Sequence, residues 1–216
     1  MGLAVFRKSG VDAVAKSIEL RELGDLKSGL LDKGFDPFSV RLKIMAGFSD
    51  NIGNFEGCPI IVKKDTTAYA IEAEFRKAVV IHNCIPEASV KVLAGIYNYG
   101  MIIGYVMENI EGPSIYGRFR QIMKTDEDAA KEEYISDFKK IRRSINEMNF
   151  KLVGHGDIHE SNIISGKLID PQPYFANGYI KRPEAFILLR DRSWLSKMAE
   201  RVARLTGSSE SELKKN

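Results

Sequence analysis

The residues from Gly154 to Asn162 read GHGDIHESN, and residues 168–170, which follow a short hairpin pattern, read LID. This stretch carries Asp157, Asn162 and Asp170, with a Ser-Gly-Lys turn between two short apolar runs in its second half. A loop followed by a hairpin can bring these three side chains to one point in space. Phosphoryl transfer needs such a set, because one carboxylate handles the proton of the acceptor hydroxyl and hard oxygen ligands hold Mg²⁺ on the phosphates.

The composition excludes several classes of protein. The chain has 216 residues, 44 % of them hydrophobic and 28 % charged, which is enough for one globular domain with a core. Its net charge of +3 is too balanced to indicate a nucleic-acid partner. No apolar run approaches the ~20 residues of a membrane span, and the first residues lack a secretory signal. The two cysteines are too few for a disulfide framework, so we expect a reducing environment. Because an apolar span and a secretory signal are both missing, we expect a cytoplasmic location and no membrane partner.

Hydrophobic spacing in the first half predicts a small sheet with helices. An apolar spacing of three to four predicts a helix over residues 11–33, with Gly34 placed to stop it. The other predicted elements are strands over 40–45 and 59–62, a helix over 67–83, and strands over 89–97 and 101–107 that turn at 98–100. This half therefore predicts a β-rich unit with a helix between its strands.

The second half, after Glu111-Gly112-Pro113, predicts mainly helix. One stripe at spacings of four and three predicts a long helix and consists of Tyr134, Phe138, Ile141, Ile145 and Met148. Short strands and turns are expected over 153–173, a helix around 194–205, and a polar, frayed end over 207–216. The complete order predicts an α+β fold class with two lobes that divide near residue 112.

The stretch 154–162 resembles the catalytic loop of the protein-kinase-like superfamily. The pattern H-x-D-x-x-x-x-N is matched by His155, Asp157 and Asn162, and the fuller pattern H-G-D-x-H-x-x-N is similar to the aminoglycoside-phosphotransferase-like branch. The resemblance implies ATP and Mg²⁺ (or Mn²⁺) as cofactors, Asp157 as catalytic base, and Asn162 and Asp170 as metal ligands. Pro-Gln follows Asp170 where most relatives have Phe-Gly, so a switch resting on that Phe is not expected.

The fold implied by this resemblance is a bilobal protein-kinase-like fold in a single domain over residues 1–216. The β-rich N-lobe would cover about 1–111, and a reduced, mostly helical C-lobe would cover about 112–216, with the nucleotide held between them. In the C-lobe, Asp191 matches the position of an acid that anchors the helix after the activation segment.

A lysine at the end of an apolar strand and a glutamate on the next helix form the second expected group. Lys63 would contact the α- and β-phosphates, whereas Lys64 alternates to the other face of the strand; the register favours Lys63 and leaves Lys64 open. A partly buried lysine needs a carboxylate partner. Glu74 is favoured over Glu72 because the residues on its face of the helix are apolar.

The resemblance also implies contacts to the nucleotide base and phosphates. The residues from Tyr105 to Gly112 look like the hinge between kinase lobes, with Met107 gating the pocket and the Glu108 carbonyl and Ile110 amide facing the adenine. The phosphate-covering loop lacks a G-x-G-x-x-G pattern. Two structures are therefore open for this loop, a backbone cradle for the phosphates and a plain hairpin turn. The nucleotide-binding residues expected from these segments and the lysine strand are Gly47, Ser49, Gly53, Ile61 and Lys63.

The short C-terminal part narrows the resemblance further. Only 46 residues follow Asp170, and in size the chain is similar to minimal serine/threonine protein kinases that bacteria deliver into host cells as effectors, in particular a family that phosphorylates the host heat-shock chaperone of the ninety-kilodalton class. This implies a monomeric virulence factor, delivered into the host cytosol, with a protein substrate. His159 stands where such kinases have a lysine, so a small-molecule phosphotransferase stays open, as does a nucleotide-binding pseudokinase.

Overall fold

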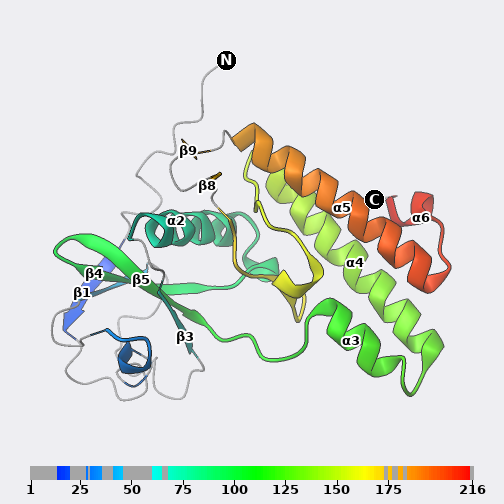
Figure 1. Ribbon diagram of the computed structural model, residues 1–216, viewed down its shortest axis with the longest axis horizontal. Helices are drawn as coiled ribbons and strands as arrows, with labels where there is room; N and C mark the ends of the chain where they lie inside the picture. The colour runs from blue at the N-terminus through cyan, green and yellow to red at the C-terminus, as the bar shows by residue number, and fades with distance from the viewer. Residues whose placement is uncertain are drawn as a thin grey trace. The chain divides into compact units, whose positions relative to one another are not determined.

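The computed structural model describes residues 14–19, 28, 30–35, 41–45, 60–64, 68–172, 175–176, 180–181 and 184–214, which form a mixed α+β structure with antiparallel sheets. The chain divides into two compact units (Figure 1). Unit 1 comprises Met1–Val80 and Lys91–Asn109, and unit 2 comprises Ile81–Val90 and Ile110–Asn216.

Unit 1 is built on a five-stranded sheet in the order β1-β2-β4-β5-β3, with every neighbouring pair antiparallel. The strands are β1 (Val14–Glu19), β2 (Arg41–Met45), β3 (Ile60–Lys63), β4 (Val92–Asn98) and β5 (Met101–Glu108). The predicted hairpin of β4 and β5 is confirmed: Tyr99 and Gly100 both have positive φ angles (47° and 81°), as a two-residue turn between twisted strands requires.

The predicted helix over 67–83 is α2 (Ala68–Cys84), which packs on this sheet. Phe75 is fully buried and its ring lies 5.8 Å from that of Tyr105 on β5. A Cβ added to Gly95 on β4 would stand 3.2 Å from the Phe75 ring, so the helix approaches β4 at a residue without a side chain. This packing fixes the face of α2 that also carries Glu74.

The prediction of a helix over 11–33 is wrong, because residues 14–19 form β1. Val14 and Ile18 are four residues apart, a spacing that suits one face of a helix and equally one face of a strand. Pairing with β2 decides between the two: Ile18 lies opposite Leu42, and Glu19 opposite Arg41. Only residues 28 and 30–32 of the predicted range are helical in the described part of the chain.

Unit 2 is dominated by two long helices. Its described helices are η4 (Pro86–Ala88), α3 (Ile115–Ile122), α4 (Glu127–Phe150), η5 (Glu160–Asn162), α5 (Glu184–Thr206) and α6 (Glu210–Lys214). The predicted long helix is confirmed as α4, which begins after Asp126, whose carboxylate accepts the amide of Ala129 at 3.0 Å. Figure 1 shows α5 lying along α4. All five residues of the predicted stripe on α4 are buried.

The predicted short strands after α4 are also present. β6 (Ile163–Ile164) and β7 (Lys167–Leu168) form the expected hairpin, which turns at Ser165 (φ 48°) and Gly166 (φ 77°). A second two-stranded sheet follows, made of β8 (Phe175–Ala176) and β9 (Ile180–Lys181). Residues 154–162 connect α4 to this hairpin and are called the 154–162 loop below.

The prediction of a frayed polar end over 207–216 is wrong for residues 210–214, which form α6. Leu213 is fully buried, and its carbonyl accepts a hydrogen bond of 2.6 Å from Arg142 on α4. One apolar side chain and one long-range hydrogen bond therefore attach this end to unit 2. Among the described helices, none has the length and apolar composition needed to cross a membrane.

Candidate active site

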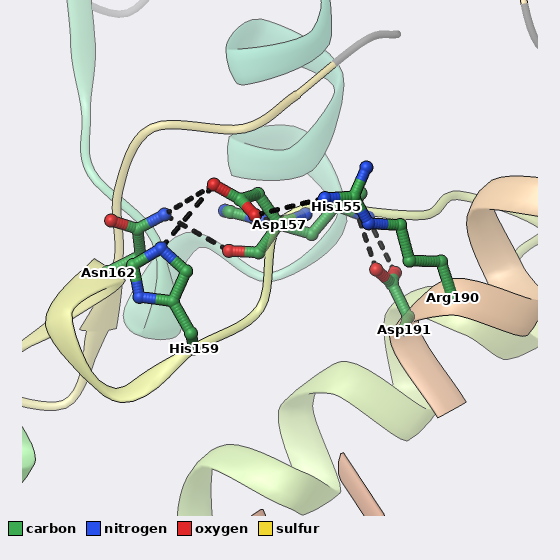
Figure 2. Close-up of polar contacts among 7 residues, drawn as sticks. His155, Asp157, His159, Asn162, Arg190 and Asp191 are labelled. Atoms are coloured by element: carbon green, nitrogen blue, oxygen red, sulfur yellow. Dashed lines mark hydrogen bonds and ion pairs between the residues drawn. The ribbon is translucent and has the colours of Figure 1, made fainter. Parts of the chain in front are cut away.

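The backbone of the 154–162 loop is fixed by a buried carboxylate from a distant helix. Asp191 on α5 is fully buried and accepts two backbone N–H groups, that of His155 at 2.6 Å and that of Gly156 at 2.8 Å (Figure 2). Charged acceptors make strong hydrogen bonds, and buried N–H groups are costly to leave unpaired. Asp191 therefore determines where the loop lies on α5.

The two glycines of the loop allow this close approach. A Cβ on Gly154 would lie 2.6 Å from the Ile187 side chain on α5. Gly156 has a φ of +88°, and a Cβ there would lie 2.3 Å from the carbonyl oxygen of Gln172. The amide of Gln172 in turn donates to the His155 carbonyl at 2.9 Å. Both glycines are therefore required by space, and Gly156 also by backbone conformation.

Asp157 and Asn162 meet at the open side of this loop. The Asn162 side-chain nitrogen donates to the Asp157 carbonyl oxygen at 3.0 Å and to its carboxylate at 3.2 Å. Two cationic or ionisable groups also reach the carboxylate, namely Arg190 Nη2 and His159 Nε2, each at 3.4 Å. The Asp157 side chain is 17 % exposed, so the carboxylate remains accessible to a ligand.

Asp170 lies next to Asn162 because of the β6–β7 hairpin. Ile169 donates its amide to the Asn162 carbonyl at 3.0 Å, which places the following residue, Asp170, beside the end of the loop. Asp170 has a φ of 55°, a conformation that Asp and Asn adopt more readily than most residues. No group of three or more His, Cys, Asp or Glu suited to a metal was found among the described residues. A metal held here would therefore use one amide and one carboxylate oxygen together with phosphate or water oxygens.

Glu160, inside the same loop, joins it to three helices. Its carboxylate accepts the hydroxyl of Tyr134 on α4 and a guanidinium N–H of Arg201 on α5, both at 2.6 Å. The Arg201 guanidinium also lies 4.1 Å from the centre of the Tyr116 ring on α3. Burial, and then the hydrogen bond to Glu160, raise the pKa of Tyr134 far above its usual range, so its hydroxyl remains a donor.

In unit 1, Lys63 on β3 forms an ion pair with Glu74 on α2 at 2.8 Å. The same carboxylate oxygen accepts the hydroxyl of Tyr105 at 2.7 Å. Tyr105 is fully buried on β5 and lies directly opposite Lys63 in the ladder of the two strands. A strand lysine, a helix carboxylate and a cross-strand tyrosine therefore form one hydrogen-bonded set.

The structure gives the alternative residues different partners. Lys64 donates to the Gly34 carbonyl at 3.1 Å and lies over the ring of Phe35. Glu72 pairs with Arg76 one turn along α2 at 2.8 Å. A pocket of about 260 Å³ adjoins the ion pair of Lys63 and Glu74. Its lining consists of Lys33, Ile61, Val62, Lys63, Lys64, Ile71 and Glu74. It is smaller than most sites for a whole small molecule but large enough for phosphate groups.

The residues expected to bind the base all lie in the described part of the chain. Met107 is buried on β5 opposite Ile61, and Glu108 accepts the amide of Lys91 on its carboxylate at 2.8 Å. Ile110 is half-buried in unit 2. The remaining expected residues, Gly47, Ser49 and Gly53, lie outside the described residues.

Three residues that take part in the site were not predicted as site residues from the sequence. Tyr105 was assigned only to an apolar strand, because its position opposite Lys63 depends on the pairing of β3 with β5. Arg190 carries no local signal, because its contact with Asp157 depends on the packing of α5. Asp191 was expected only as an anchoring acid of this helix, and the structure shows that it holds the backbone of the 154–162 loop.

Comparison with known proteins gives no match at a significant level. No protein-family model matches the chain, and no curated protein or solved structure does either. The function of the chain is therefore inferred below from the two residue sets, Lys63–Glu74–Tyr105 in unit 1 and Asp157–Asn162–Asp170 in unit 2.

Proposed function

We propose that this chain is an ATP-dependent phosphotransferase with a protein-kinase-like bilobal fold. The observation that carries the proposal is the orientation of Asn162. Its side-chain nitrogen donates to both the carbonyl oxygen and the carboxylate of Asp157, while its side-chain oxygen makes no hydrogen bond with any described residue. That oxygen is a hard ligand next to a reactive carboxylate, which is the arrangement that metal-dependent phosphoryl transfer uses.

In this proposal Asp157 is the catalytic base. The acceptor hydroxyl oxygen attacks the γ-phosphorus of ATP, the bond from that phosphorus to the β–γ bridging oxygen breaks, and ADP leaves. Asp157 takes the proton of the hydroxyl. Arg190 and His159 lie 3.4 Å from its carboxylate and would stabilise the charge that develops on the transferred phosphoryl group.

The metal and the phosphates are assigned to specific side chains. Asn162 and Asp170 would hold Mg²⁺, or Mn²⁺, which would supply charge neutralisation on the phosphates when bound. Lys63 would bind the α- and β-phosphates, and its ammonium is already oriented by Glu74. Tyr105 restrains the carboxylate in turn, so the lysine loses less conformational freedom when the nucleotide binds.

The acceptor class follows from the resemblance of the 154–162 loop to the catalytic loop of kinase-like proteins. We infer a serine or threonine of a protein as acceptor, with a host heat-shock chaperone of the ninety-kilodalton class as the first candidate. A monomeric effector acting in the host cytosol rests on the same resemblance. The alternative acceptor is a small molecule of the aminoglycoside or sugar type, and a pseudokinase would show nucleotide binding without transfer.

Thermal denaturation with and without Mg-ATP tests the nucleotide assignment. Nucleotide at about 100 times its dissociation constant stabilises the folded state by about 2.7 kcal/mol, which raises the melting temperature by roughly 5–10 °C. Asp170→Asn should lose most of this shift and still fold, because Asn accepts the positive φ of this position. Asp128→Asn makes the same chemical change at an exposed position on α4 and should keep the shift. An unchanged melting temperature of the wild type at millimolar Mg-ATP contradicts the proposal.

A further inference from the structure

One face of α5 carries a row of basic residues with a tryptophan among them. The residues at spacings of four, three, four and three are Arg190, Trp194, Lys197, Arg201 and Arg204, and together they are called the α5 stripe. These spacings place all of them on one side of the helix. The stripe spans about 21 Å at 1.5 Å per residue.

The stripe begins at the candidate catalytic base. Arg190, its first member, reaches the Asp157 carboxylate at 3.4 Å, and Figure 2 shows it extending from α5 to the loop. The ring of Trp194 lies 6.2 Å from that of His159, the other ionisable neighbour of this carboxylate. A ligand bound along the stripe would therefore extend to the Asp157 carboxylate, where the acceptor hydroxyl would react.

Two cations of the stripe are available to a ligand. Lys197 and Arg204 are exposed, and neither forms an ion pair with a carboxylate of any described residue. Lys197 lies over the half-exposed Trp194 ring at 5.0 Å. Arg201 is already engaged by Glu160.

The nearby acids offset only part of this charge. Glu200 is exposed on α5, three residues from Lys197 and four from Arg204, so it balances one of these two cations. The Glu160 carboxylate accepts hydrogen bonds from Tyr134 and Arg201. The buried Asp191 carboxylate accepts hydrogen bonds from two backbone amides of the loop. The described surface next to Asp157 along α5 is therefore positive on balance.

We propose that the α5 stripe binds an acidic segment of a protein acceptor, next to the serine or threonine that receives the phosphate. This inference rests on the proposed function and specifies its substrate class. A length of 21 Å matches about six residues of an extended peptide. Small-molecule sites are concave, whereas the stripe follows the face of a helix. A polycationic aminoglycoside would be repelled by the charges that attract an acidic peptide.

Fluorescence of Trp194 measures this binding without any nucleotide. The sequence contains one tryptophan, so a change of emission on titration reports the stripe directly. The probes are two peptides of seven residues with a central serine, one flanked by aspartates and one by lysines. We expect saturable binding of the aspartate peptide, weakened by high salt, and at least tenfold weaker binding of the lysine peptide.

A matched pair of double variants tests the location. Lys197→Glu with Arg204→Glu should weaken binding of the aspartate peptide by about tenfold or more, because two attractions become repulsions. Arg192→Glu with Arg143→Glu changes the net charge equally at exposed positions outside the stripe and should leave the affinity within about twofold. Equal weakening by both pairs would mean that only net charge matters and would overturn the inference.

Transfer assays separate this inference from the proposed function. If Mg-ATP stabilises the protein and a serine peptide is phosphorylated, the kcat/KM for the aspartate peptide should exceed that for the lysine peptide by at least tenfold, mainly through KM. The stripe pair should reduce this preference, and the control pair should retain it. Phosphorylation with equal kcat/KM for both peptides, or of kanamycin in place of either peptide, overturns the acidic-acceptor inference while the phosphotransferase assignment stands. Absence of a Mg-ATP shift overturns the proposed function itself.

Discussion

The lysine–glutamate pair of unit 1 and the 154–162 loop of unit 2 hold charged side chains in different ways. Lys63 and Glu74 stand on a strand and a helix, and their side chains are 22 % and 19 % exposed. The loop has little regular structure, and its backbone is held by Asp191, which is fully buried on another element. One arrangement depends on side-chain contacts between regular elements, and the other depends on a buried carboxylate that satisfies backbone N–H groups.

This difference predicts different effects of mutation. Removing a partly exposed side chain from the pair leaves the strand and the helix intact, so ligand binding should change more than stability. Removing the buried acceptor leaves two N–H groups without a partner in unit 2, so stability should change first. The predictions below test this contrast through the free energy of unfolding, from the largest expected change to the smallest.

Asp191→Ala should cause the largest loss of stability, about 3–5 kcal/mol, because two buried N–H groups lose a charged acceptor. Urea unfolding followed by Trp194 fluorescence measures this change within the same unit. Asp191→Asn keeps one acceptor oxygen and should lose about half as much, which keeps the test informative if the alanine variant does not fold. Values for both variants within about 0.5 kcal/mol of the wild type contradict the role of Asp191.

Gly156→Ala should lose about 2–4 kcal/mol, because the added Cβ meets the Gln172 carbonyl at 2.3 Å and the residue has a positive φ. Gly166→Ala is the matched control in the same unit. Its φ is +77°, but no atom lies within 4 Å of the added Cβ, so it should lose only about 1 kcal/mol. Equal losses in the two variants would show that the loop does not pack against residue 172 as described.

Lys63→Met and Glu74→Gln should each change the free energy of unfolding by only about 1 kcal/mol, since solvent screens part of the pair. Both variants should nevertheless lose most of the Mg-ATP shift in melting temperature. Arg76→Met removes a pair of the same length from the same helix and should keep that shift. A normal shift in Lys63→Met would remove the lysine from the proposed nucleotide site.

Asp137→Asn should have the smallest effect and the clearest dependence on pH. Burial raises the pKa of Asp137 in the folded protein, so its ionisation opposes folding as pH rises above the ordinary aspartate value of about 3.9. At neutral pH the variant should be more stable than the wild type by roughly a few tenths of a kcal/mol. The difference should vanish below about pH 3.9, and a difference that grows with acidity contradicts this reasoning.

The sequence predicted best what depends on neighbouring residues. The β6–β7 hairpin follows from the Ser165-Gly166-Lys167 turn between apolar pairs, and α4 follows from a regular stripe. The helical face that favoured Glu74 is the face that meets Lys63 in the structure.

Features that depend on distant packing could not be predicted in the same way. The spacing of Val14 and Ile18 suits a helix or a strand, and only pairing with β2 decides it. Arg190 and Tyr105 join the site through contacts between elements, 33 and 31 residues along the chain from Asp157 and Glu74. No local pattern near either residue identifies these contacts.

Transfer of labelled γ-phosphate from ATP by the wild type and by Asp157→Ala tests the central claim most directly. The acceptors are a heat-shock chaperone of the ninety-kilodalton class, a serine peptide flanked by aspartates, and kanamycin. We predict label on a protein or peptide acceptor, and a rate about 10²- to 10⁴-fold lower for Asp157→Ala with ATP affinity within about twofold of the wild type. No transfer by a wild type that binds Mg-ATP, or equal rates for the two proteins, would contradict the assignment of Asp157 as catalytic base of a phosphotransferase.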